Sequence, residues 1–150
     1  MDLSKKRCGE CGEKAYVIKT LVGPWQKQWK DYPFIFLLED LELWVCGHCH
    51  SHAVTPGDAE KIDRAIENSV REQTSQYLKI IKAKTDLSFE QIAVRIGKSP
   101  AYVSSLLNKK KTPAFGLWNQ LKSAAIDPVV EMQRLDPKLD IIKKNILLRA

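Results

Sequence analysis

The sequence predicts an α+β fold, in which a small strand-rich N-terminal module is followed by an all-helical bundle. Three observations predict this division. Two Cys-x-x-Cys pairs bracket the first part of the chain, aromatic and β-branched residues dominate the segment between them, and short capped helical patterns follow from residue 55 onward. The 150 residues suit one domain or two small ones. We expect four parts: a module at 1–55, a helical linker at 56–76, a helical bundle at 77–126 and a helical tail at 127–150.

The chain's cysteines form two pairs of identical spacing, Cys8/Cys11 and Cys46/Cys49. Each pair places two thiolates on a tight turn, and two such turns together supply the tetrahedral sulfur cage that a structural Zn²⁺ prefers. Because four cysteines fill the coordination shell, we expect one structural Zn²⁺ per chain in a zinc-ribbon-like module, with no open position for a substrate. A redox-active dithiol, disulfides and free thiols are the alternatives.

Two further sequence observations predict the solubility and the location of the protein. The longest apolar run, Phe34–Leu38, has five residues, which is far too short to span a membrane. Residues 1–7 are polar and basic and are not followed by the apolar core of a signal peptide. We therefore expect a cytoplasmic protein without a membrane partner, whose reduced thiols favour a metal over disulfides.

Between the cysteine pairs the pattern favours strands at 16–18, 34–38 and 41–45, separated by turn residues. These strands predict a small antiparallel sheet with the metal at one end. Two tryptophans, Trp25 and Trp29, lie in a polar stretch, where they suit either a partner-binding patch or the core of the module.

Helix start signals recur after residue 54. Thr55 and Asp58 form a capping box around a proline at the first helical position, although whether one helix or two cover 56–84 stays open. Further boundaries are predicted by a capping box at Ser88–Gln91, a left-handed stop at Gly97, and starts at Ser99-Pro100, Thr112-Pro113 and Asp127-Pro128. The apolar positions of the tail are the best candidate dimer surface: Val129, Val130, Met132, Leu135, Leu139, Ile141, Ile142, Ile146 and Leu147.

The net charge of +6 is unevenly distributed. Residues 1–55 carry seven cationic and seven anionic side chains, whereas residues 99–126 carry four lysines and no acid. A local excess of this kind is typical of a surface that contacts nucleic-acid phosphates, although a lysine run is also a common solvated surface.

The segment 87–108 resembles the XRE/Cro-type helix-turn-helix family. The matching features are Leu87-Ser88, Ile92-Ala93, Gly97, Ser99 and Val103, while Phe89 stands where many members have Gln. The resemblance covers about 77–126 and implies that the second helix enters the major groove of double-stranded DNA. It places these residues at the DNA: Pro100, Ala101, Tyr102 and Ser105 at the base edges, Asn108, Lys109, Lys110 and Lys111 near the phosphates, and Ser99 at the start of the DNA-binding helix. Only Tyr102 and Ser105 among the base-facing residues can hydrogen-bond through a side chain, so we expect methyl contacts, water and DNA shape to contribute to recognition.

The order of these motifs, with Cys8-Gly9-Glu10-Cys11, then Cys46-Gly47-His48-Cys49, then the helix-turn-helix, resembles the MqsA/YgiT-type zinc-finger antitoxin family. This resemblance implies zinc binding and capture of a toxin protein by the N-terminal half. It also implies homodimerisation through the C-terminal half and repression of the protein's own operon at a palindromic operator. The tail 127–150 and the tryptophan-rich insert depart from the family pattern.

Three other functions are weighed against this one: a stand-alone phage or mobile-element regulator, an RNA-binding zinc-ribbon protein, and a thiol oxidoreductase. We expect no enzyme, because four matched cysteines favour a metal and no catalytic triad, carboxylate pair or phosphate-binding loop is visible. His48, His50 and His52 flank the second cysteine pair, and exposed positions or an accessory metal contact are both open for them.

Overall fold

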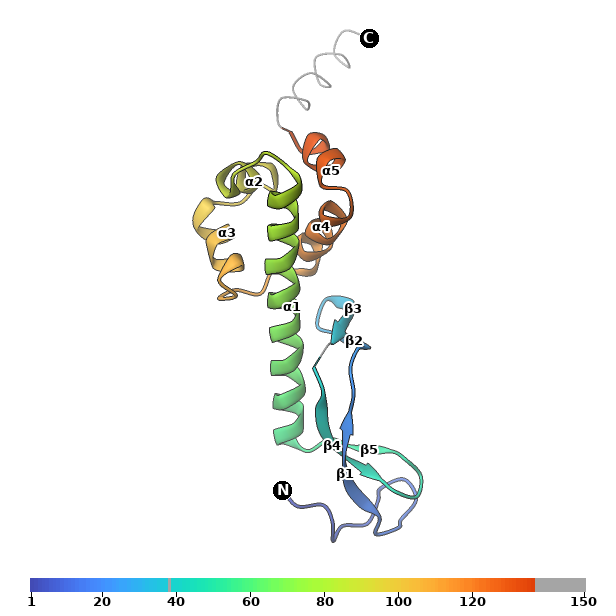
Figure 1. Ribbon diagram of the computed structural model, residues 1–150. Helices are drawn as coiled ribbons and strands as arrows, with labels where there is room; N and C mark the ends of the chain where they lie inside the picture. Colours follow the sequence, from blue (N-terminus) through green and yellow to red (C-terminus); the bar gives the residue numbers. More distant parts are fainter. Residues whose placement is uncertain (38, 137–150) are drawn as a thin grey trace. The chain divides into compact units, whose positions relative to one another are not determined.

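The computed structural model describes residues 1–37 and 39–136 and confirms the α+β fold (Figure 1). In chain order the elements are β1 (Tyr16–Leu21), β2 (Trp25–Trp29), β3 (Tyr32–Leu37), β4 (Leu41–Cys46), β5 (His52–Ala53), α1 (Pro56–Lys84), α2 (Phe89–Arg95), α3 (Pro100–Leu107), α4 (Phe115–Ile126) and α5 (Pro128–Arg134). The chain divides into two compact units, residues 1–69 and residues 70–150. Within the described residues, no helix has the length and apolar character that a bilayer crossing requires.

The strands of the first unit form two small sheets. β4 lies between β1 and β5 in one antiparallel sheet, and β2 pairs with β3 in the other. The register of the first sheet sets Tyr16 opposite Cys46, so the second cysteine pair begins where β4 ends. The strand β2 was not predicted, because its residues 26–28 are polar and exposed and give no alternating apolar signal.

The core of the first unit combines strand residues with the start of α1. The buried apolar side chains are Leu3, Trp29, Tyr32, Ile35, Leu37, Leu41, Leu43, Val45, Ala65 and Ile66. The indole Nε1 of Trp29 donates a hydrogen bond to Asp63 Oδ1 at 3.1 Å. Trp29 therefore packs in the core and does not form an exposed patch.

The helix α1 is continuous over Pro56–Lys84, which answers the question that the sequence left open. Its predicted capping box is present, since the Thr55 backbone N–H donates to Asp58 Oδ2 and the Asp58 N–H donates to Thr55 Oγ1. The polar residues in its middle do not break it. The hydroxyl of Thr74 donates to the Val70 carbonyl within the helix, and the hydroxyl of Ser75 donates to the Leu107 carbonyl.

Among the described residues, five helices of the second unit, counting the end of α1, enclose one apolar cluster. Its buried members are Leu78, Ile81, Ile92, Ala93, Ile96, Val103, Leu106, Leu121, Ala124 and Met132. In the view of Figure 1, α2 and α3 lie on one side of the end of α1, and α4 and α5 lie on the other. The division between units falls within α1, inside the segment 56–76 that was predicted as a linker.

Two expectations for the C-terminal part need correction. The start of α4 is Phe115 with Ala114 as N-cap, not Thr112-Pro113, because the Thr112 hydroxyl instead accepts a hydrogen bond from Arg71 Nε at 2.8 Å. Met132 is buried in the cluster and is therefore removed from the predicted dimer surface, while Val129 and Val130 are exposed. Five members of that surface lie outside the described residues: Leu139, Ile141, Ile142, Ile146 and Leu147.

Candidate metal centre and nucleic-acid interface

The two cysteine pairs sit on turns with the same backbone hydrogen bonds. In the first turn, the Cys8 N–H donates to the Glu13 carbonyl and the Gly12 N–H donates to the Cys8 carbonyl. In the second, the Cys46 N–H donates to the Ser51 carbonyl and the His50 N–H donates to the Cys46 carbonyl. The fourth residue after the first cysteine has a positive φ in both, 76° at Gly12 and 61° at His50. The repeated spacing of the sequence therefore produces two equivalent turns.

These turns bring the four predicted ligands together. The Sγ atoms of Cys8, Cys11, Cys46 and Cys49 all lie within 4.8 Å of one another. The Cys8–Cys49 and Cys11–Cys46 sulfur pairs are each 3.6 Å apart. A tetrahedral ion with metal–sulfur bonds of about 2.3 Å needs sulfurs roughly 3.8 Å apart. The four cysteines are thus placed to bind one metal ion, and the cluster lies within the first unit.

Hydrogen-bond donors lie beside Cys8 and Cys49 and favour the ionised form of these two side chains. Ser51 Oγ lies 3.3 Å from Cys8 Sγ and 3.1 Å from Cys49 Sγ. The Ser51 hydroxyl, followed by the backbone N–H of Cys11, lowers the pKa of Cys8 to about 5, with a smaller contribution from the Tyr16 hydroxyl. The Ser51 hydroxyl also lowers the pKa of Cys49. A site prepared for thiolates is what a divalent cation requires.

The pKa of Cys11 shifts in the opposite direction. A backbone hydrogen bond at Glu13 lowers the pKa of Cys11, but burial and the neighbouring sulfurs of Cys46, Cys49 and Cys8 outweigh it and raise that pKa to about 12. Four adjacent thiols resist simultaneous ionisation because like charges repel, and a bound cation removes this conflict. The position of the four sulfurs within 4.8 Å of one another therefore fits a bound metal ion.

The three histidines near the second turn are not part of this cluster. His48, His50 and His52 are exposed, and the group of possible ligands found among the described residues contains the four cysteines alone. Sequence reasoning missed Ser51 and Tyr16, whose contacts with the sulfurs depend on the turn and on the register of β1.

The second unit contains the helix pair that the sequence predicted. Ser88 and Gln91 form the capping box that starts α2. Ile96 is the C-cap of α2, and Gly97 follows it with a φ of 69°. Ser99 then caps α3, accepting a hydrogen bond from the Tyr102 N–H, with a proline at the first helical position. Val103 and Leu106 turn into the apolar cluster. The opposite face of α3 is exposed to solvent.

The predicted DNA-contacting residues are distributed along that solvent-facing side. Ser99, Pro100, Ala101, Asn108, Lys109, Lys110 and Lys111 are exposed, while Tyr102 and Ser105 are half-buried. The hydroxyl of Ser105 already donates to the Ala101 carbonyl at 3.1 Å, within its own helix. Ser104, which the sequence analysis did not select, is exposed and lies within 3.5 Å of the Asn108 amide. The sequence could have identified Ser104, because it follows Ala101 by three residues and therefore lies on the same face of the helix.

A cationic cluster surrounds the ring of Tyr102. The ammonium of Lys98 lies 5.5 Å from the ring centroid, and that of Lys111 lies 5.2 Å from it. Lys98 comes from the turn between α2 and α3, and Lys111 comes from the segment after α3. The fold therefore adds Lys98 to the predicted lysines and concentrates positive charge at one phenol ring.

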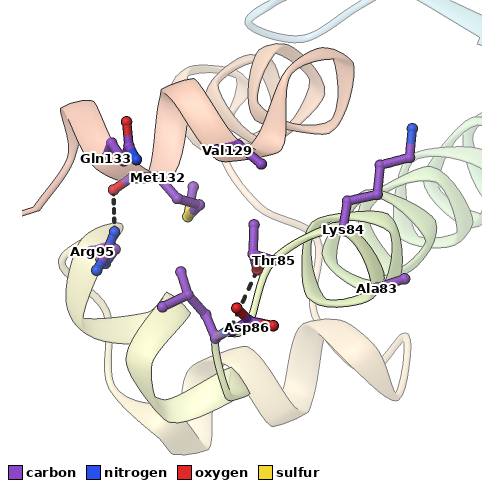
Figure 2. A pocket seen from close by; sticks show the side chains of 9 residues that line it. Ala83, Lys84, Thr85, Asp86, Arg95, Val129, Met132 and Gln133 are labelled. Atoms are coloured by element: carbon purple, nitrogen blue, oxygen red, sulfur yellow. Dashed lines mark hydrogen bonds between the residues drawn. The ribbon is translucent and has the colours of Figure 1, made fainter.

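A hollow of about 310 Å³ lies where the end of α1 and the end of α2 meet α5. Figure 2 shows Arg95 at one side of it, donating a hydrogen bond to the Met132 carbonyl. The same guanidinium pairs with Asp136 at 3.4 Å. These contacts attach α5 to the helix pair, so we assign the hollow a structural role.

Comparison of the chain with protein-family models, with curated proteins and with solved structures finds no match.

Proposed function

We propose that this chain is a sequence-specific DNA-binding transcriptional repressor that holds one structural Zn²⁺ in its N-terminal unit. The observation that carries the proposal is the composition of the α3 surface. It presents small and polar side chains to solvent and is flanked by the lysine pair around Tyr102. The surrounding stretch 99–126 contains no acid. A small-featured helix with cations at its edge suits the major groove between two phosphate backbones.

In this proposal α3 lies in the groove and each group has a separate role. Ala101 offers a methyl group to thymine, and Tyr102 and Ser104 offer hydrogen bonds to base edges or to bridging water, while Asn108 lies near the phosphates. Lys98, Lys110 and Lys111 contact phosphates and position the helix without reading sequence. One such helix touches few base edges, so we propose a homodimer that sets two α3 helices about 34 Å apart on a palindromic site.

Zinc is proposed as the metal because of the ligands. Four thiolates at tetrahedral spacing suit Zn²⁺ better than Mg²⁺ or Ca²⁺, which prefer oxygen. With four protein ligands the ion supplies cross-linking of the two turns. Elemental analysis of reduced protein is expected to give one zinc per chain, and protein without metal, or with iron instead, would contradict this assignment.

The resemblance in motif order makes the antitoxin of a toxin–antitoxin operon the specific form of this proposal, with a toxin as partner of the N-terminal unit. A stand-alone regulator of a phage or mobile element is the alternative. Co-purification with the product of the adjacent reading frame distinguishes the two.

Selection from a pool of random-sequence duplexes tests the central proposal. The full chain with bound metal should enrich a two-fold symmetric motif whose half-sites lie one helical turn apart. Tyr102→Ala should retain DNA on the protein but lose the enrichment. Lys122→Gln is the matched control, because it removes a lysine of the same acid-free stretch on α4 and should change nothing. Absence of enrichment by the unmodified chain, or equal retention of single-stranded RNA, would refute DNA recognition.

A further inference from the structure

The helices α2 and α3 end in the same hydrogen-bonded motif. At the end of α2, the Gly97 N–H donates to the Val94 carbonyl and the Lys98 N–H donates to the Ala93 carbonyl. At the end of α3, the Lys109 N–H donates to the Leu106 carbonyl and the Lys110 N–H donates to the Ser105 carbonyl. Both are Schellman motifs, whose central residue adopts a left-handed conformation.

The two motifs differ at that central residue. Gly97 has a φ of 69°, which glycine adopts without steric conflict, whereas Lys109 has a φ of 59°. A lysine in this conformation is uncommon, because its Cβ crowds the backbone. Lys109 therefore occupies a position that glycine would adopt with less strain.

The backbone around Lys109 is held by α1. Arg71 donates from its Nη1 to the Lys109 carbonyl at 3.3 Å and from its Nε to Thr112 Oγ1 at 2.8 Å. Ser75, one turn further along α1, donates to the Leu107 carbonyl at 2.9 Å. These three bonds fix the segment after α3, so the Lys109 side chain leaves from a defined point.

The ammonium of Lys109 is paired with Glu72, the residue next to Arg71 on α1. Both side chains of the pair are 45% exposed. The carboxylate of Glu72 also accepts a hydrogen bond from Gln76 Nε2 at 3.2 Å, which keeps it beside the lysine. Lys110 and Lys111 show no ion pair among the described residues.

We propose that Glu72 is an internal competitor of the DNA phosphates for Lys109, so that it sets how tightly the protein binds any duplex without affecting which sequence it prefers. This inference rests on the proposed DNA-binding function. Glu72 lies on α1, outside the helix pair of the proposed DNA-binding surface, and it acts on affinity mainly through Lys109.

The exposure of the pair makes such competition physically reasonable. An ion pair that is nearly half exposed is weak, because water and salt screen it. A DNA phosphate can therefore displace Glu72, and the displaced carboxylate then lies near a polyanion that repels it. Removing the charge of Glu72 should both release Lys109 and abolish this repulsion.

A double-mutant cycle on the full chain tests the proposal. DNA affinity would be measured by fluorescence anisotropy between about 0.05 and 0.2 M salt for the unmodified chain, Glu72→Gln, Lys109→Gln and the double variant. Glu72→Gln should tighten binding about two- to fivefold near 0.1 M salt, equally on preferred and random duplexes. It should also steepen the log-affinity against log-salt slope by up to about 0.9. In the Lys109→Gln background, Glu72→Gln should change both the affinity and the salt slope only slightly.

The control is Glu131→Gln, which removes the acidic partner of another partly exposed ion pair in the same unit, with Arg134 at 2.8 Å. It should leave affinity and slope unchanged. The inference fails if Glu131→Gln tightens binding as much, since net charge would then explain the effect. It also fails if Glu72→Gln alters neither affinity nor slope, or acts equally with and without Lys109. A chain that binds no duplex before any substitution overturns the proposed function and this inference together.

Discussion

Different interactions stabilise the interior of each of the two units of this chain. In the first unit, short strands and the start of α1 enclose a limited apolar core, and four cysteine sulfurs within 4.8 Å of one another join the two turns at its end. In the second, helices enclose one apolar cluster, and no comparable ligand group lies among the described residues. A small module has too small a core to be stable on its own, and a metal cross-link can supply the missing folding free energy. A helical bundle with a larger apolar cluster does not need such a cross-link. The two units should therefore respond to different perturbations.

The largest expected effect is loss of the metal centre. Cys46→Ser removes a fully buried ligand, so the first unit should unfold while the second keeps its helices. Circular dichroism should retain most of the helical signal, and limited proteolysis should cut only before about residue 70. Replacement of the exposed Ser4 by alanine serves as a control and should change neither readout. Intact strands in the Cys46→Ser protein would show that the metal is not needed for folding.

The reverse perturbation targets the apolar cluster. Leu106→Ala leaves a cavity under α3 and should reduce the free energy of unfolding of the second unit by about 2–5 kcal/mol. The metal content should stay the same, because the cysteines belong to the other unit. Leu107→Ala, one residue further on and only half-buried, should be milder in chemical denaturation. Metal loss on Leu106→Ala would mean that the two cores are coupled.

The lysines and Tyr102 should separate affinity from specificity. Lys110→Gln and Lys111→Gln should each reduce the salt slope of duplex binding by about 0.9, on every sequence alike. Lys109→Gln should reduce it less, because Glu72 already pairs with that ammonium. Tyr102→Ala should instead reduce discrimination between preferred and random duplexes by about 1–3 kcal/mol. A uniform loss on Tyr102→Ala would place this ring at the phosphates and not in the groove.

The smallest effects concern the two helix ends. Gly97→Ala places a Cβ at a φ of 69° and should destabilise the second unit by about 1 kcal/mol. Lys109→Gly should do the opposite and raise stability by a few tenths of a kcal/mol, because glycine relieves the strain but loses more entropy on folding. Denaturation midpoints of the two variants give the comparison. Destabilisation by Lys109→Gly would mean that its ion pair outweighs the strain.

Local patterns predicted the local features well. The four cysteines were identified by spacing alone, and the caps at Thr55, Ser88 and Ser99 depend on residues three positions away. The start of α4 was missed because Thr112 is engaged by Arg71, which lies 41 residues away. A cap residue in the sequence does not reveal such a competitor.

Contacts between distant segments account for the other omissions. The hydroxyl of Tyr16 reaches the sulfur of Cys8 because β1 pairs with β4 in one register, and no local pattern specifies that register. The pairing of Glu72 with Lys109 likewise requires that α1 packs beside the end of α3. Charge counts along the chain do not distinguish Lys109, Lys110 and Lys111, although in the fold Lys109 forms an ion pair with Glu72.

We propose that duplex recognition resides in the helical unit and that the metal stabilises only the N-terminal unit. The most direct test is the affinity of the full chain for its selected duplex, measured by anisotropy at fixed salt before and after removal of the metal by a chelator. We predict that binding persists within about threefold after the metal is gone, because the apolar cluster alone supports α3. Loss of DNA binding in step with metal release, or no duplex binding in either state, would contradict the account.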